Sequence, residues 1–170
     1  TLERLPDQLW KLTSLWELRA YATIRLEKLP DIESGQTSLP LTKLSLYHSN
    51  ITALPSGISQ LSNLEDLDLS SCGHLLSIAE LPPNLKYISA YNCPSLGRLN
   101  LSNLKLLRKL ELTSCSALTE ILGLEELTSL DEMDLRGCGR SLLKHTLTKP
   151  LFQVLNISNS YLIICQKFVG

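Results

Sequence analysis

The chain has 170 residues, of which 44% are hydrophobic and 5% aromatic, and its 16 basic residues almost balance its 17 acidic ones. This balance excludes the strong positive field needed to bind along a nucleic-acid backbone, so no nucleic-acid partner is expected. No apolar stretch approaches the roughly 18 residues of a membrane helix, and the opening residues TLER do not resemble a signal peptide, so no membrane partner is expected either.

Leucines recur along the chain at a regular spacing. The first of them, Leu2, Leu5, Leu9 and Leu12, read as the back half of a repeat, so we expect the chain to be a fragment. Six LxxLxL-type runs then follow, and their middle residues are Leu18, Leu44, Leu67, Ile88, Leu110 and Met133. The steps between these residues are 26, 23, 21, 22 and 23, which is the period of leucine-rich repeats.

This period predicts an α/β-type repeat solenoid, the leucine-rich-repeat horseshoe, with a parallel sheet on its concave side. The array is expected to span residues 1–150 in about six repeats. The strands should lie near residues 15–20, 41–46, 64–69, 85–90, 107–112 and 130–135. Leu-Pro pairs recur between the strands, as at Leu29-Pro30 and Leu54-Pro55, and proline blocks a long helix. The convex side should therefore be mostly irregular or 3₁₀.

Residues 151–170 are open to two interpretations. Phe152, Leu155 and Ile157 restore the LxxLxL spacing, and Leu155 lies 22 residues after Met133, which favours a seventh strand over 152–157. The other interpretation is the start of a post-repeat segment. The tail from Tyr161 onward carries no repeat signal and is left unassigned.

Four of the five cysteines stand at one position, three residues after the end of a leucine run. Over all repeats that position holds Thr23, Ser49, Cys72, Cys93, Cys115, Cys138 and, if there is a seventh repeat, Ser160. These side chains are small and can hydrogen-bond to the neighbouring turn, so we interpret them as a structural ladder of reduced thiols and hydroxyls. No CxxC pair supports a zinc or redox site. Stacked free thiols persist best in a reducing compartment, which favours a cytoplasmic location.

No motif for catalysis is present. The three histidines show no paired metal-ligand spacing, and no phosphate-binding glycine loop opens a helix. The acidic pairs Asp66-Asp68 and Glu132-Asp134 alternate along predicted strands, as residues of a solvated face do. We therefore expect no enzyme activity, no cofactor and no metal.

The residues between the leucines should point to the open concave face of the sheet. Four of the five tyrosines fall there, and tyrosine offers rigid contact area for a protein partner, although it also simply suits strands. The expected partner-binding residues are Tyr21, Tyr47, Asp66, Asp68, Tyr87, Tyr91, Glu111, Asp134 and Arg136.

The segment Leu81 to Leu96, with the sequence LPPNLKYISAYNCPSL, resembles the C-terminal repeats of plant intracellular immune receptors. These receptors combine a Toll/interleukin-1-receptor-like domain, a nucleotide-binding domain and leucine-rich repeats. The LxLxxC segments Leu67 to Cys72 and Leu110 to Cys115 resemble the same family, and the resemblance covers about residues 1–150. Leu147 to Phe152 also resembles the beginning of the family's post-repeat domain.

The resemblance implies a non-enzymatic recognition and autoinhibitory region in plant defense, disease resistance and innate immunity. The implied partners are a pathogen effector or a guarded host protein, and a nucleotide-binding domain of the same polypeptide. Nucleotide binding and NAD cleavage would belong to other domains. Two alternatives stay open: an extracellular ligand-binding repeat domain, which the sequons at Asn50, Asn100 and Asn156 allow, and the substrate-docking repeats of a ubiquitin ligase.

Overall fold

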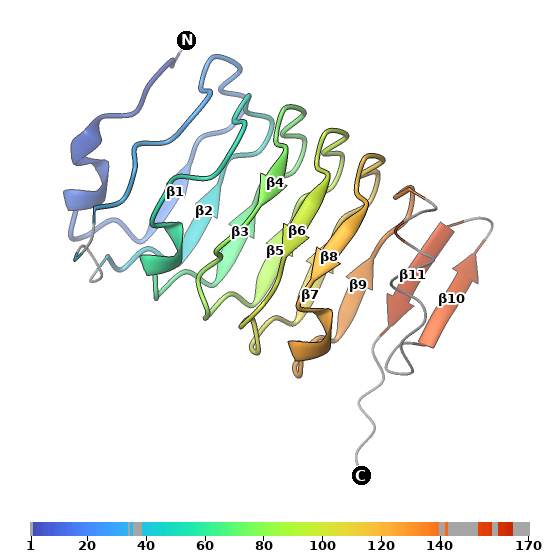
Figure 1. The fold of residues 1–170 in the computed structure, drawn as a ribbon. Coiled ribbons are helices and arrows are strands. Elements are labelled where there is room, and N and C mark those ends of the chain that lie inside the picture. Colours follow the sequence, from blue (N-terminus) through green and yellow to red (C-terminus); the bar gives the residue numbers. More distant parts are fainter. Residues whose placement is uncertain are drawn as a thin grey trace.

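The computed structural model describes residues 2–33, 35, 39–139 and 142, and the strand backbone of 153–157 and 160–164. Its described part is a solenoid of stacked coils that lie side by side in chain order (Figure 1). No helix within these residues has the length and apolar character to cross a membrane.

Each coil contributes one three-residue strand to the larger sheet. These strands are β1 (Glu17–Arg19), β2 (Lys43–Ser45), β3 (Asp66–Asp68), β5 (Tyr87–Ser89), β7 (Lys109–Glu111) and β9 (Glu132–Asp134). Neighbouring strands pair in parallel, and the middle residues of the leucine runs pair with one another, as Leu44 does with Leu67. The predicted parallel-sheet solenoid is confirmed.

The strands are short because the chain leaves the sheet at the same point in every coil. A residue with positive φ, from +51° at Ala22 to +73° at Gly137, stands directly before each ladder position. The six residues are Ala22, His48, Ser71, Asn92, Ser114 and Gly137. Their left-handed conformation turns the chain inward after each strand.

A second, smaller parallel sheet lies beside the first (Figure 1). Its strands are β4 (Ser77–Ile78), β6 (Arg98–Asn100) and β8 (Glu120–Leu122). The prediction of an irregular or 3₁₀ convex side did not include this sheet. In the sequence, the smaller sheet is indicated by a second set of LxxL runs, such as Leu96-Gly97-Arg98-Leu99. Their leucines are buried in the same core.

In the described part of the chain, three short 3₁₀ helices lie in the connections: η1 (Asp7–Lys11), η2 (Ile58–Gln60) and η3 (Leu124–Glu126). Glycines with positive φ, Gly57 and Gly123, precede the last two. Apolar side chains, mostly leucines, from both sheets and from these helices pack into one continuous core. Because each coil buries its leucines against its neighbours, the core is a stack and not a single centre.

The end of the chain differs from a seventh repeat. Strand β10 (Gln153–Ile157) does form where the LxxLxL spacing returns, but it pairs antiparallel with β11 (Ser160–Ile164). Strand β11, and not β10, lies next to β9, and this pairing is also antiparallel. Only residues 158 and 159 separate the two strands, and so short a connection suits a hairpin but leaves no chain for the crossover that parallel pairing requires. Ser160 accordingly starts a strand instead of occupying a ladder position.

Candidate protein-binding face

The open face of the larger sheet carries the side chains that flank the buried middle residue of each strand, and those just after the strand. Four tyrosines project from it with exposed fractions of 50% for Tyr21, 37% for Tyr47, 45% for Tyr87 and 39% for Tyr91. Large aromatic side chains so exposed on a sheet face are available for contact with a partner.

Three of these tyrosines form a cluster. The rings of Tyr21 and Tyr47 meet edge to face with centroids 6.2 Å apart, and the rings of Tyr47 and Tyr91 are 6.3 Å apart. Tyr47 and Tyr91 belong to coils that are not adjacent, because β3 lies between β2 and β5. The corresponding position after β3 holds Ser70, whose small, buried side chain leaves room for the two rings to approach. A hydrogen bond with Tyr47 raises the pKa of the Tyr91 phenol.

Two carboxylates lie beside the cluster on β3. Asp68 accepts hydrogen bonds from the Ser45 hydroxyl at 2.8 Å and from the Ser70 backbone N–H at 3.0 Å, which hold it in place. Asp66 is half-buried, and burial raises its pKa, although nearby Lys43 opposes the rise. Within the described residues neither carboxylate forms an ion pair.

Two tyrosines of the cluster, Tyr21 and Tyr91, and both carboxylates line a shallow depression of about 330 Å³, which we call the aromatic hollow. It is lined by Glu17, Arg19, Tyr21, Lys43, Leu44, Ser45, Asp66, Asp68, Ser70, Ser89 and Tyr91. At one end Arg19 donates a 2.6 Å hydrogen bond to Glu17 and lies 6.0 Å from the centre of the Tyr21 ring. Tyr47 and Tyr87 stand on the same face but do not line the hollow.

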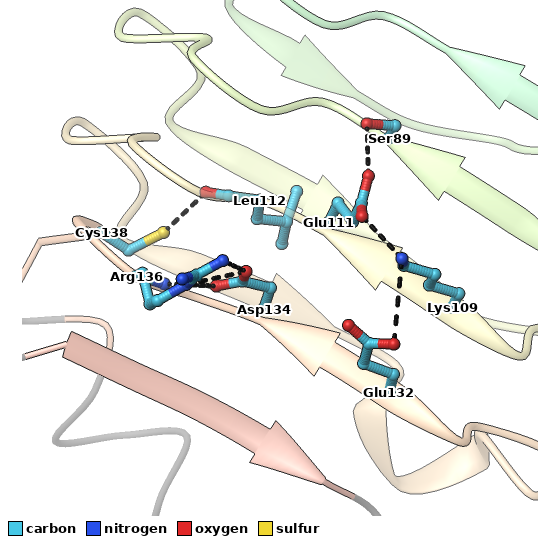
Figure 2. A network of polar contacts seen from close by, with 8 residues as sticks. All are labelled: Ser89, Lys109, Glu111, Leu112, Glu132, Asp134, Arg136 and Cys138. Carbon is cyan, nitrogen blue, oxygen red and sulfur yellow. Dashed lines mark hydrogen bonds and ion pairs between the residues drawn. The ribbon is translucent and has the colours of Figure 1, made fainter. Parts of the chain in front are cut away.

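The other half of the face is internally paired (Figure 2). The Ser89 hydroxyl donates to Glu111 at 3.1 Å, and Lys109 pairs with Glu111 at 2.7 Å and with Glu132 at 3.8 Å. Hydrogen bonding to Glu111 raises the pKa of Lys109. The charge of Glu111, one of the predicted contact residues, is therefore neutralised within the molecule.

The structure corrects the prediction for Asp134. Its side chain is only 5% exposed, because the Arg136 side chain covers it with hydrogen bonds of 2.6 to 3.0 Å, and the Arg136 backbone N–H adds another at 3.0 Å (Figure 2). Burial alone would raise the pKa of Asp134, but the bonds from Arg136 and Thr113 outweigh burial and lower it. Asp134 consequently offers a partner no free carboxylate, and Arg136 is already engaged.

The cysteines link successive coils. Each thiol donates to a carbonyl at the end of the preceding strand region: Cys72 to Leu46 at 3.2 Å, Cys93 to Leu69 at 3.1 Å, Cys115 to Ala90 at 2.9 Å and Cys138 to Leu112 at 3.0 Å. All four are free and buried. In the first coils, Thr23 bonds to Ala20, and the Ser49 hydroxyl lies 3.5 Å from the Cys72 sulfur.

Burial raises the pKa of Cys72, and it raises that of Cys138 to about 12, so these thiols stay protonated at neutral pH. The described residues contain no group of three or more side chains that could hold a metal ion. The contacts of the thiols are those of a structural element that ties coil to coil.

The structure thus brings together five of the nine predicted contact residues, namely Tyr21, Tyr47, Asp66, Asp68 and Tyr91. Sequence reasoning placed Glu17, Arg19, Lys43 and Ser70 on the same face but did not single them out. The alternation of side chains along the strands identifies the open face. The hollow, in contrast, depends on the small Ser70 between the larger Tyr47 and Tyr91.

Comparison with solved structures finds the same fold. The leucine-rich repeat domain of the type III effector XopL matches 84% of this chain and 51% of its own chain, with a TM-score of 0.67 and 28% identity. No protein-family model matches the chain. Among curated proteins, disease resistance protein RPS4 of Arabidopsis thaliana is 34% identical over 111 residues, which are 56% of this chain and 9% of that protein.

TMV resistance protein N of Nicotiana glutinosa is 49% identical over 57 residues, or 34% of this chain and 5% of that protein. Over its leucine-rich repeats, the chain is thus similar to plant disease resistance proteins. Disease resistance-like protein DSC1 of Arabidopsis thaliana is also similar, with 42% identity over 89 residues, which are 52% of this chain and 7% of that protein. This chain matches less than a tenth of the length of each of these curated relatives.

Proposed function

We propose that this chain is the non-enzymatic, protein-recognising part of an intracellular plant immune receptor that acts in the defense response to pathogens. Similarity to plant resistance proteins supports the setting. The observation that carries the role of the face is a cluster of three exposed tyrosines, two of which line the aromatic hollow. Beside them stand two carboxylates that form no ion pair with any described residue. Aromatic anchors of this kind supply most of the binding energy in protein interfaces.

The partner is a pathogen effector or a guarded host protein, which binds the half of the open face formed by β1, β2, β3 and β5. Before it binds, a nucleotide-binding domain of the same polypeptide rests on the repeats and keeps the receptor inactive. If the partner and the nucleotide-binding domain cannot contact the repeats at the same time, partner binding shifts the receptor toward its active state. The size of the shift is set by how much more tightly the partner binds the uncovered repeats than the covered ones. A tenfold preference corresponds to about 1.4 kcal/mol.

The intracellular setting is supported by two sets of contacts. The four buried thiols remain free, as they would in a reducing compartment. Two of the sequon asparagines have structural roles, because the Asn50 amide donates to the Ile24 carbonyl at 2.6 Å and the Asn100 side chain accepts from the Ser102 N–H. These amides fasten one coil to the next or shape a turn, so they are poorly placed to carry glycans.

The test uses the full receptor that contains this chain, expressed in leaf tissue with its triggering partner. Tyr21→Ala, Tyr47→Ala and Tyr91→Ala combined should abolish the partner-dependent defense response, since loss of each anchor costs about 2 kcal/mol of binding. Arg98→Ala with Glu120→Ala, an exposed ion pair of the smaller sheet, is the matched control and should respond normally.

An unchanged response of the triple variant, at equal protein level, would overturn the proposed face. Autoinhibition has its own readout in the same plants, which is the response without the partner. Variants that loosen the contact between the repeats and the nucleotide-binding domain should give a defense response without the partner. If no open-face variant gives a response without the partner, autoinhibition by this face is contradicted.

A further inference from the structure

The carboxylates of the open face fall into two groups. Glu17, Glu111, Glu132 and Asp134 each form an ion pair with a cation of the same face. Asp66 and Asp68, which project from the central strand β3, form none within the described residues. Among the described residues of this face, the unpaired carboxylates therefore coincide with the aromatic hollow.

The surroundings of the two aspartates favour the binding of a cation. Hydrogen bonds from Ser45 and Ser70 orient Asp68, while Asp66 lies half-buried beside Lys43, which does not come within ion-pair distance. A half-buried carboxylate without a counter-ion loses hydration and regains little in return. A cation placed in the hollow would remove that cost for Asp66 and use both carboxylates at once.

The walls of the hollow favour a planar cation. Tyrosine faces attract cations, and Arg19 already lies 6.0 Å from the Tyr21 ring centre at the edge of the hollow. A guanidinium can stack on an aromatic ring and bond to carboxylates through its forked N–H groups at the same time, whereas a lysine ammonium is more strongly hydrated. Arg19 itself is tied to Glu17 and leaves the β3 aspartates unmatched.

We propose that the aromatic hollow takes an arginine side chain of the partner protein, with its guanidinium against the Tyr91 ring and paired with Asp66 and Asp68. This inference rests on the proposed function and adds the chemistry of the recognised residue. The partner's surface contributes its apolar contacts to the surrounding tyrosines, and the arginine fixes the register of the complex.

The test titrates the purified chain with the peptide acetyl-Gly-Arg-Gly-amide and with its citrulline analogue, a neutral side chain of nearly the same shape. Tyrosine ring signals in NMR spectra report the binding site. We expect the arginine peptide to shift the signals of Tyr21 and Tyr91, which line the hollow, and to bind about tenfold more tightly than the citrulline peptide, because charge-assisted hydrogen bonds contribute that much.

Asp66→Asn and Asp68→Asn should each weaken the arginine peptide by about tenfold, while Glu111→Gln, a paired carboxylate on the same face, should leave its affinity unchanged. Equal binding of both peptides would overturn the proposal, and so would equal losses in all three variants. Thermal unfolding of each variant shows that the fold is retained. If the receptor loses its response on tyrosine substitution while this titration fails, the proposed function stands and the arginine assignment alone is wrong.

Discussion

At the scale of single residues, two aspartates of one face show how the surroundings set the chemistry. Burial dominates at Asp66 and raises its pKa, whereas hydrogen bonds outweigh burial at Asp134 and lower its pKa. The difference arises because Arg136 forms an ion pair with Asp134, whereas no described residue forms an ion pair with Asp66. Asp66 is therefore the one suited to an external cation, and Asp134 is part of the fold.

The Asp134 pair gives a pH-dependent stability. A carboxyl whose folded pKa lies below its ordinary value of 3.8 contributes stability above that value and loses it as the pH falls through the folded pKa. Arg136→Gln should lower the free energy of unfolding at pH 7, because it removes the side-chain hydrogen bonds that favour the ionised form of Asp134 in the fold. Urea unfolding should show the difference shrinking below about pH 4; a constant difference down to pH 2 would exclude this linkage.

At the scale of elements, the turns between strands set the geometry of the coils. Gly123 has a φ of +76° at the start of η3, and a Cβ there would stand 2.4 Å from the Ser102 backbone nitrogen. No flexible side chain is involved, so the neighbouring coil itself would have to move. This close approach explains why a glycine is needed at Gly123, whereas Glu80, at the matching register position after β4, has a positive φ with a side chain.

Gly123→Ala should destabilise the chain by about 2 kcal/mol or more, through backbone strain together with the clash. Gly73→Ala is the matched control, since a Cβ at Gly73 meets nothing within 4 Å and its φ is not positive, and it should change stability by less than about 1 kcal/mol. Thermal unfolding measures both. Equal effects of the two substitutions would mean that the coil contact at Ser102 is not tight.

The thiol ladder also predicts a pH effect. The folded pKa of Cys138, about 12, lies above the ordinary value of 9.0, so its contribution to stability is complete below pH 9 and is lost as the pH rises toward 12. Cys138→Ser keeps a donor for the Leu112 carbonyl but does not titrate in this range. Unfolding at pH 8 and pH 10.5 should show the wild-type chain losing more stability than Cys138→Ser, and parallel losses would argue against a buried thiol.

Much of this architecture follows from the sequence because leucine spacing reports burial directly. The strand phase places Tyr47 and Asp66 on the open face from the sequence alone. The hollow could not be predicted, because it depends on how the rings lean over Ser70. The burial of Asp134 depends on the conformation of Arg136, and the hairpin depends on which of two strands meets β9; neither is encoded in a repeat spacing.

At the scale of the whole molecule, the solenoid presents one continuous face with two different halves. The half formed by β1, β2, β3 and β5 holds the aromatic hollow, and the half formed by β7 and β9 neutralises its own charges (Figure 2). Because each coil contacts mainly its neighbours, the chemistry of one half can differ from that of the other without affecting the fold. We therefore expect recognition to be confined to the aromatic half.

Hydrogen exchange tests this expectation most directly. The full receptor is compared with and without the protein that triggers it, and amide protection is followed across the open face. The account predicts increased protection at residues 17–21, 43–47, 66–70 and 87–91, with little change at 109–113 and 132–136. Protection confined to the latter two segments, or absent from the open face altogether, would contradict the assignment of the aromatic half as the binding site.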